Sequence, residues 1–189
     1  MKICWCFCGS FCTFSRAFAE MERFAREGNE IIPVGSFNFL SCDTRFGSAR
    51  SHRAKIEEVC QREMIDTIVT AEPVGPVIKP DITIVAPCTG NTLSKIASGV
   101  SDTPVTLAVK AHLRTGKPVL IALASNDALG ANMQNIASLL VRRNVFFVPM
   151  REDDPINKRD SLVCDFSLIG DALSSALRGD PLRPLFLGT

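Results

Sequence analysis

The sequence predicts an α/β fold, a single-domain three-layer sandwich in which helices cover both faces of a parallel sheet. Strand-like and helix-like segments alternate along all 189 residues, which is the pattern of parallel strands joined by crossover helices. Several strand-like segments are also continuous apolar runs, as expected of strands buried on both faces. The length suits one domain over residues 1–189, with a C-terminal tail from about residue 180.

The first half of the chain contains three predicted strands. Phe14, Phe18 and Met21 recur at helical spacing after the first strand, and prolines and a glycine over residues 72–76 interrupt any regular element. In order, we expect a strand over 3–8, a helix ending at Gly28, a strand over 30–34, a polar loop over 36–50, helices over 51–60 and 65–71, and a strand over 82–86.

The second half continues the alternation. Asp102 or Thr103 can cap a helix whose first residue is Pro104, a position that proline favours. In order, we expect a helix from about Asn91, the capped helix ending at Gly116, a strand over 118–124, a helix over about 131–143, a strand over 145–149, a charged loop over 151–159, and a last helix reaching Leu177.

Composition excludes several classes of partner. The formal net charge is +1, the basic residues are scattered, and the chain has one Trp and no Tyr, so nothing favours binding to nucleic acid. No segment approaches the roughly 20 apolar residues of a membrane span, and the N-terminus lacks a signal-peptide pattern. We therefore expect a cytoplasmic protein with no nucleic-acid or membrane partner.

The eight cysteines allow two interpretations. Cys4, Cys6 and Cys8 alternate, so they share one face of a strand. Small buried hydrophobic residues in a reducing compartment are the favoured interpretation, because free cysteine is among the most buried residue types. A metal site that includes Cys12 is the alternative. No cysteine or histidine spacing matches a zinc finger, and we predict no metal.

Candidate binding residues follow the predicted strands, because ligands of such folds bind beyond the carboxyl ends of the strands. Gly9 and Ser10 open a helix and, with the Thr13 hydroxyl, form a possible phosphate cradle; an ordinary helix cap is the alternative. Small polar residues after the later strands suit the oxygens and the pyrimidine edge of a flavin. The candidate cofactor-binding residues are Gly9, Ser10, Thr13, Ser36, Phe37, Pro87, Thr89, Asn91, Thr92, Ser125 and Asn126.

One stretch resembles a known signature. Its pattern is Pro87, Thr89, Asn91, Thr92, Lys95, Ala97, Gly99 and Asp102. It is similar to the signature of the FMN-binding flavoprotein superfamily, which includes cysteine decarboxylases and flavin prenyltransferases. The resemblance implies a Rossmann-like flavoprotein fold, FMN as cofactor, and a homo-oligomer built from trimers.

Five motifs resemble those of a narrower family, the dipicolinate synthase B subunits. They lie at residues 9–13, 43–47, 71–76, 110–114 and 126–130. The resemblance implies synthesis of dipicolinic acid from 4-hydroxy-tetrahydrodipicolinate, by loss of water and a two-electron oxidation. It also implies a dehydrogenase-like partner, the A subunit of dipicolinate synthase, and the mother-cell cytoplasm of a spore-forming bacterium. A decarboxylase of the cysteine-decarboxylase type, and a flavin-binding or scaffolding subunit without its own chemistry, are the alternatives.

Departures from the related families bear on the chemistry. The prenyltransferases carry an Arg-Glu pair where this chain has Ser125 and Asn126, and the decarboxylases use a histidine after the second strand. This chain has only His52, which we predict to be a solvated surface residue, and His112, which we predict to be structural or exposed. Neither is proposed as a base.

The implied substrate is a small dicarboxylate, so its pocket should contain arginine or lysine. Arg45, in a glycine-flanked loop, is the first candidate for catalysis and carboxylate binding. Arg114 is a second carboxylate ligand, one helical turn from Lys110, with a solvated surface charge as the alternative. Asp127 is a candidate catalytic acid or base, and Asp43 and Glu72 can transfer protons or act only as caps. Whether the flavin is redox-active or structural stays open.

Overall fold

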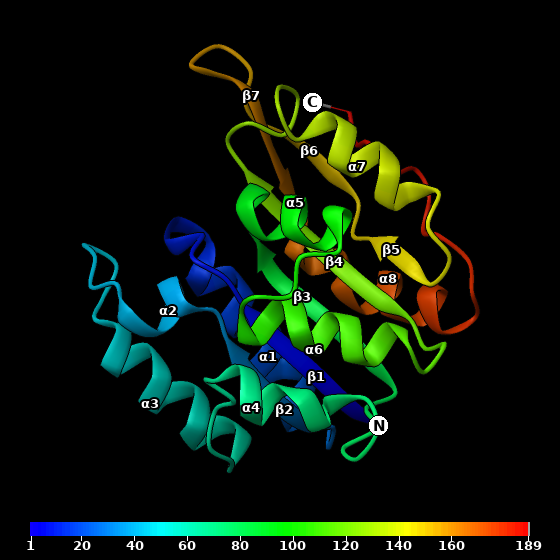
Figure 1. The fold of residues 1–189 in the computed structure, drawn as a ribbon. Helices are drawn as coiled ribbons and strands as arrows, with labels where there is room; N and C mark the ends of the chain where they lie inside the picture. The colour runs from blue at the N-terminus through cyan, green and yellow to red at the C-terminus, as the bar shows by residue number, and fades with distance from the viewer. Residues whose placement is uncertain (189) are drawn as a thin grey trace.

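The chain folds around a seven-stranded sheet that lies between two layers of helices (Figure 1). This computed structural model describes residues 1–188. The strands are β1 (Lys2–Phe7), β2 (Glu30–Gly35), β3 (Ile82–Cys88), β4 (Val119–Ser125), β5 (Val145–Phe147), β6 (Met150–Asp154) and β7 (Lys158–Cys164). Their order is β2-β1-β3-β4-β7-β6, with β5 also paired to β4. Strands β1 to β5 are parallel, so the predicted α/β fold class is confirmed.

Helices cover both faces of this sheet, with α5, α6 and α7 on the near side in Figure 1 and α1 and α8 on the far side. The helices are α1 (Phe14–Arg26), α2 (Phe37–Ser41), α3 (Ala49–Cys60), α4 (Ile68–Ala71), α5 (Gly90–Ser98), α6 (Pro104–Leu113), α7 (Met133–Leu140) and α8 (Ile169–Leu177). Three single 3₁₀ turns adjoin them at Phe11–Thr13, Glu72–Val74 and Phe166–Leu168. None of the helices within residues 1–188 combines the length and apolar character needed to cross a bilayer.

The prediction of a continuous loop over residues 36–50 is wrong, because this segment contains α2 and the start of α3. The Ser36 hydroxyl accepts a hydrogen bond from the Phe39 amide at 3.3 Å and so caps α2. The Phe39 ring is fully buried and stacks on Phe7 at 5.3 Å between ring centroids. A helix of five residues has too few positions to show helical periodicity, so burial of one aromatic side chain decides the local structure.

The prediction of a charged loop over residues 151–159 is also wrong. Strands β6 and β7 form an antiparallel hairpin there, and its turn is closed by the Asp154 carboxylate, which accepts from the Asn157 amide at 3.1 Å. Strand β4 pairs with β5 along its first half and with β7 near its end, where Ser125 faces Leu162. The same edge of β4 therefore carries a parallel strand and an antiparallel one.

The core lies along β1, β3 and β4, whose side chains are almost completely buried. The Trp5 indole N–H donates to the Ala86 carbonyl at 3.0 Å, which satisfies the polar group of the largest buried side chain. Cys4, Cys6 and Cys8 are buried in this core, in agreement with the favoured interpretation. Within residues 1–188, no three histidine, cysteine or acidic side chains gather into a possible metal site.

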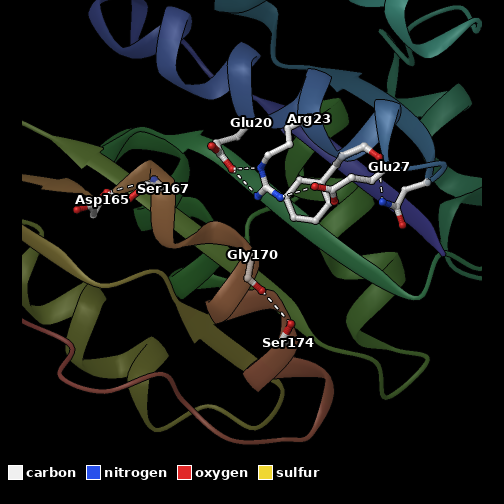
Figure 2. Close-up of polar contacts among 9 residues, drawn as sticks. Glu20, Arg23, Glu27, Asp165, Ser167, Gly170 and Ser174 are labelled. Atoms are coloured by element: carbon white, nitrogen blue, oxygen red, sulfur yellow. Dashed lines mark hydrogen bonds and ion pairs between the residues drawn. The ribbon is translucent and has the colours of Figure 1, made fainter.

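A charged cluster on α1 lies beside the start of α8 on the far side of the sheet (Figure 2). Arg23 forms ion pairs with Glu20 on the same helix at 2.7 Å and with Glu27, the residue that follows the helix, at 2.8 Å. A Cβ atom at Gly170, in the first turn of α8, would lie 3.2 Å from the Arg23 guanidinium. The missing side chain at Gly170 thus allows α8 to approach α1 closely.

The C-terminal tail packs against the start of β6 in the same chain. The Met150 amide donates to the Leu185 carbonyl at 2.9 Å, the Leu187 amide donates to the Met150 carbonyl at 2.8 Å, and the Leu185 side chain is buried. These contacts hold the tail beside β6. Residue 189, the end of the predicted tail, lies outside the described residues.

Candidate functional site

A cleft of ≈ 740 Å³ opens at the carboxyl ends of β1, β3 and β4. The order of the strands reverses between β1 and β3, with β2 added on one side of β1 and β3 and β4 on the other, and open parallel sheets bind ligands at such a position. The volume lies within the range of ordinary small-molecule sites. The cleft is lined by Gly9, Ser10, Phe11, Cys12, Thr13, Asn38, Phe46, Thr89, Gly90, Asn91, Ala124, Ser125, Asn126, Asp127, Asp153, Lys158, Ser161 and Val163.

The N-terminus of α5 forms the centre of the cleft. The Thr89 hydroxyl accepts from the Thr92 amide at 3.3 Å and caps the helix. The first amides of a helix have no carbonyl of their own helix to bond, so those of Gly90 and Asn91 are available to a ligand oxygen. The Asn91 side chain adds one carboxamide to this group of donors.

A second group of donors lies at the start of α1. The Thr13 hydroxyl donates to the Ser10 carbonyl at 2.8 Å, so the turn at residues 10–13 is held closed. A Cβ atom at Gly9 would lie 3.2 Å from the Cβ atom of Asn38 and 3.3 Å from the Phe11 ring, so glycine keeps this entrance open. Gly9, Ser10 and Thr13, the residues predicted to form a cradle, thus all line the cleft.

The third wall is a hydrogen-bonded network around Asp127. One carboxylate oxygen accepts from the Ser125 hydroxyl at 2.5 Å and the other from the Asn132 amide group at 2.8 Å. The network packs directly on Gly90, where a Cβ atom would lie 2.4 Å from the Ser125 oxygen. Both Asp127 oxygens are engaged, so this carboxylate fixes its neighbours in place and sits beside the N-terminus of α5, where a negative charge is stabilised.

The hairpin supplies a fourth wall that the sequence analysis missed. Asp153, Lys158 and Ser161 line the cleft from β6 and β7, and the hairpin is attached to the Asp127 loop because the Leu129 amide donates to the Asp160 carbonyl at 3.0 Å. The Asp-Pro step at residues 154–155, followed by Asn157, is a turn signal that could have indicated a hairpin.

Four candidate cofactor residues are not part of the cleft lining. The Ser36 side chain caps α2, and Phe37 is exposed on the same short helix. Pro87 lies in the last residues of β3 after a cis peptide bond, and the buried Thr92 hydroxyl accepts from Thr89 at 3.2 Å. Ser36 and Thr92 thus support the loops that carry the lining residues.

A buried thiol lies behind the cleft. Burial raises the pKa of Cys8 to about 11, even though hydrogen bonding to Thr92 and to the Thr89 backbone acts in the opposite direction. Cys8 is therefore a neutral thiol at physiological pH and has no nucleophilic character.

Arg45 lies at the tip of a tight turn beside the cleft. The turn is closed by reciprocal hydrogen bonds between the backbones of Thr44 and Gly47, at 3.0 and 3.1 Å. The Arg45 guanidinium lies 4.9 Å from the centre of the Phe46 ring, and Phe46 itself lines the cleft. The arginine thus projects from the rim and is not locked in an ion pair within the described residues.

The prediction that His52 is a solvated surface residue is wrong. Its ring packs edge-on against Phe14 and Phe18, with centroids 5.2 and 5.4 Å apart, and its Nε2 atom is buried without a partner in the described chain. Burial, with a smaller effect of Lys55, lowers its pKa. Gly47 covers this ring, since a Cβ atom there would lie 2.7 Å from it.

The other charged candidates lie apart from the cleft. Arg114 and Lys110 are at the C-terminal end of α6, near the amino ends of the strands, and a single chain does not bring Arg114 to the cleft. Glu72 lies in a separate hollow with these two residues. The Asp43 carboxylate accepts from the Ala49 amide at 2.9 Å, which is the capping role left open for it.

Comparison with known proteins assigns the family. The model of the family described as "Flavoprotein" matches residues 4–173. The chain belongs to this flavoprotein family. Within it, the chain is 40% identical over 179 residues to the dipicolinate synthase B subunit of Bacillus subtilis, and the match covers 95% of this chain and 90% of that protein.

Solved structures agree with this assignment. The crystal structure of the dipicolinate synthase B subunit from Bacillus halodurans has a TM-score of 0.90 and 34% identity, and covers 100% of this chain and 96% of that one. The FMN-dependent cysteine decarboxylase SpaF has a TM-score of 0.67 and 23% identity, with 94% of this chain and 95% of that chain covered. At that identity the likeness to SpaF concerns the fold. The resemblance stated from motifs alone is confirmed.

The donors of the cleft fit a flavin mononucleotide. Such a molecule carries a phosphate, a chain of hydroxyl groups and a flat ring with a polar edge. The cleft offers a helix-start turn with Ser10 and Thr13, hydroxyls and amides along the start of α5, and the carboxamides of Asn91 and Asn126. Phe11 and Phe46 add apolar surface. Positions 9 and 90 are glycines, and a Cβ atom added at either one would crowd against neighbouring side chains. The absence of a side chain keeps the backbone accessible at both positions.

Proposed function

We propose that this chain is the B subunit of a dipicolinate synthase. It binds FMN in the cleft and acts with a dehydrogenase-like A subunit to form dipicolinate from 4-hydroxy-tetrahydrodipicolinate. The observation that carries the proposal is the 40% identity, over nearly the whole chain, to the dipicolinate synthase B subunit of Bacillus subtilis. The reaction removes one water molecule and transfers two electrons and two protons from the substrate to an acceptor.

FMN is the flavin favoured for this cleft. SpaF, which shares the fold, is described as FMN-dependent. When bound, the cofactor supplies an acceptor for a pair of electrons. The residues proposed to hold it are Gly9, Ser10 and Thr13 at the phosphate, and Thr89, Asn91, Ser125 and Asn126 along the rest of the molecule.

Two cations at the rim are proposed to bind the substrate carboxylates. Arg45 is exposed at the tip of its turn and can close over a ligand, and its guanidinium can pair with a carboxylate through two parallel hydrogen bonds. Lys158 lies on the opposite wall, where Asp153 holds it and raises its pKa, so the ammonium stays charged. A dicarboxylate between them would be fixed at both ends.

The Asp127 carboxylate is proposed to act as a positioning group. The Ser125 hydroxyl donates its hydrogen bond to the Asp127 carboxylate. The lone pairs of the Ser125 oxygen therefore point elsewhere and can accept a hydrogen bond from an N–H or O–H group of the ligand. We propose this role in place of the catalytic one first expected of Asp127, because each of its oxygens already accepts from a protein donor.

The test is reconstitution with a purified A subunit. The chain should be yellow as purified and release FMN on denaturation, and the two proteins together should form dipicolinate faster than either one separately. Arg45→Ala should lower turnover at least tenfold while FMN stays bound, because loss of one charged hydrogen-bonded pair costs about 1.5–3 kcal/mol.

Three outcomes would contradict the proposal at different points. A colourless protein that takes up no added FMN removes the cofactor. Full-rate dipicolinate formation by the isolated A subunit reduces this chain to a scaffold. Release of carbon dioxide from a peptide ending in cysteine, without dipicolinate formation, would favour a decarboxylase.

A further inference from the structure

A second hollow, of ≈ 490 Å³, lies in the near helical layer of Figure 1, between the end of α5, the second half of α6 and the segment that joins α7 to β5. We call it the basic pocket. It shares no lining residue with the flavin cleft. Residues 110–114 lead into the start of β4, so the pocket lies toward the amino ends of the strands, and the cleft lies at their carboxyl ends.

Four cationic side chains surround the basic pocket. Lys110 and Arg114 lie one helical turn apart on one side, and the consecutive Arg142 and Arg143 lie on the other. No acidic residue lines the pocket, and none of the four cations forms an ion pair within residues 1–188. The whole chain is nearly neutral, with 21 basic and 20 acidic residues. Glu72 lies in an adjoining hollow that Lys110 and Arg114 also line, but it forms no ion pair with either of them within residues 1–188. The basic pocket itself therefore carries a local excess of positive charge, and an anion would reduce the mutual repulsion of the four cations.

Two of the four cations are held by neutral hydrogen-bond acceptors. The Arg142 guanidinium donates to the Ile96 carbonyl at 3.1 Å, at the C-terminal end of α5. The Lys110 ammonium donates to the Ser101 hydroxyl at 3.2 Å. These bonds restrict the side chains without neutralising their charge. Arg142 and Lys110 therefore lose less conformational entropy when a ligand binds than freely moving side chains would.

The floor of the basic pocket is apolar. Ile96 and Val109 are almost completely buried, and Leu113 packs against the same core. An inorganic anion would leave this floor in contact with water. A ligand that carries its charges on an apolar body would cover the floor and still reach the cations, which is the usual composition of a small-molecule site.

We propose that the basic pocket binds a compact organic dianion, in which two carboxylates are carried by an apolar ring or a short apolar chain. One carboxylate pairs with Lys110 and Arg114, and the other with Arg143 and the free donors of Arg142. Guanidinium groups take carboxylates through parallel hydrogen bonds, which gives the geometry of recognition as well as its charge. No residue of the cleft takes part. The probe named below is the product of the proposed synthase reaction and can also enter the cleft, so variants of Arg45 and Arg114 are needed to tell the two sites apart.

The test uses pyridine-2,6-dicarboxylate as the probe and its neutral diamide as the control ligand, with flavin-loaded protein and titration calorimetry. The dianion should bind saturably and the diamide should not. Arg114→Gln and Arg143→Gln should each weaken binding roughly tenfold, as expected for one charge-assisted contact. Arg50→Gln is the matched control, since Arg50 is exposed on α3, and should leave binding unchanged.

Other results would overturn the proposal. Absence of saturable binding removes the site. Binding that Arg45→Ala weakens, and Arg114→Gln does not, would place the dianion in the flavin cleft. If Arg114→Gln and Arg143→Gln alter the sedimentation of the protein and leave dianion binding unchanged, the pocket is an interface between copies of the chain. If only a glutamate-rich peptide binds, the occupant is an acidic protein segment.

Discussion

At the scale of single residues, the direction of the hydrogen bond between Ser125 and Asp127 decides whether Ser125 offers the cleft a donor or an acceptor. The Asp127 carboxylate can only accept hydrogen bonds, so Ser125 must donate its proton to it and Asn132 must present its amino group. The Ser125 oxygen is then available to the cleft as an acceptor. The position of Asp127 was predictable from the loop after β4, but this polarity was not, because Asn132 comes from the start of α7.

Asp127→Asn should reverse this arrangement with almost no change in volume. The new amide can satisfy only one of its two neighbours as before, so the Ser125 proton turns toward the cleft. We expect FMN affinity to fall about tenfold, the effect of one mismatched hydrogen bond of about 1–1.5 kcal/mol. Fluorescence titration of the protein with FMN measures it. Ser125→Ala is the control, and it should reduce affinity without any further effect of Asp127→Asn in the double variant. Unchanged affinity in Asp127→Asn would show that the flavin does not contact Ser125.

At the scale of helices and strands, α5 and α6 both begin with a threonine cap, and only the cap of α5 lines the cleft. Comparing the two caps distinguishes an effect on stability from an effect on binding. Thr103 caps α6, and its hydroxyl accepts from the Thr106 amide at 3.2 Å. It is one of the two residues, with Asp102, that the sequence offered for this cap. Thr89 begins α5 with an equivalent bond, at 3.3 Å, to the Thr92 amide. Thr89 lines the cleft and Thr103 does not.

Thr103→Ala and Thr89→Ala should each lower the free energy of unfolding by about 1 kcal/mol, the usual cost of removing a helix cap. Only Thr89→Ala should also weaken FMN binding. Urea unfolding of the flavin-free protein gives the first quantity and FMN titration the second. Equal loss of FMN affinity in both variants would indicate that the cleft responds to general destabilisation, and Thr89 would then have no direct role.

Elements defined by local signals were predictable, and those defined by distant partners were not. A cap, a proline at the first position and a glycine stop placed α6, because these signals act within a few residues of the helix ends. Strand β7 begins with Lys158, Arg159 and Asp160, all exposed, and gains its place by pairing with the end of β4. No local pattern encodes that partner, so the fourth wall of the cleft was absent from the predicted site.

At the scale of the whole molecule, one buried histidine links folding to pH. His112 is fully buried in α6, and its Nε2 atom lies 3.0 Å from the Pro118 carbonyl, to which the neutral ring donates. Burial lowers its pKa from 6.5 to about 4. The folded state thus favours the neutral ring, and the unfolded chain binds a proton more readily.

Stability should therefore decrease as the pH falls below 6.5 toward 4. A depression of this size corresponds to roughly 3 kcal/mol, and most of that should be lost by pH 4.5. His112→Gln keeps an N–H donor near the Pro118 carbonyl and does not titrate. Urea unfolding at pH 7 and pH 4.5 should show a smaller difference for His112→Gln than for the natural chain. Identical differences would assign the acid sensitivity to other groups.

The divided edge of β4 has a consequence for how this architecture can vary. Its first half is completed by β5, which belongs to the repeating strand–helix framework, and its last residues are completed by the β6–β7 hairpin, which borders the cleft. The framework and this wall of the cleft thus attach to separate stretches of one strand. A hairpin of different length or charge can be exchanged without changing the register of the parallel sheet, so this wall can diverge while the loops after β1 and β3 stay unaltered.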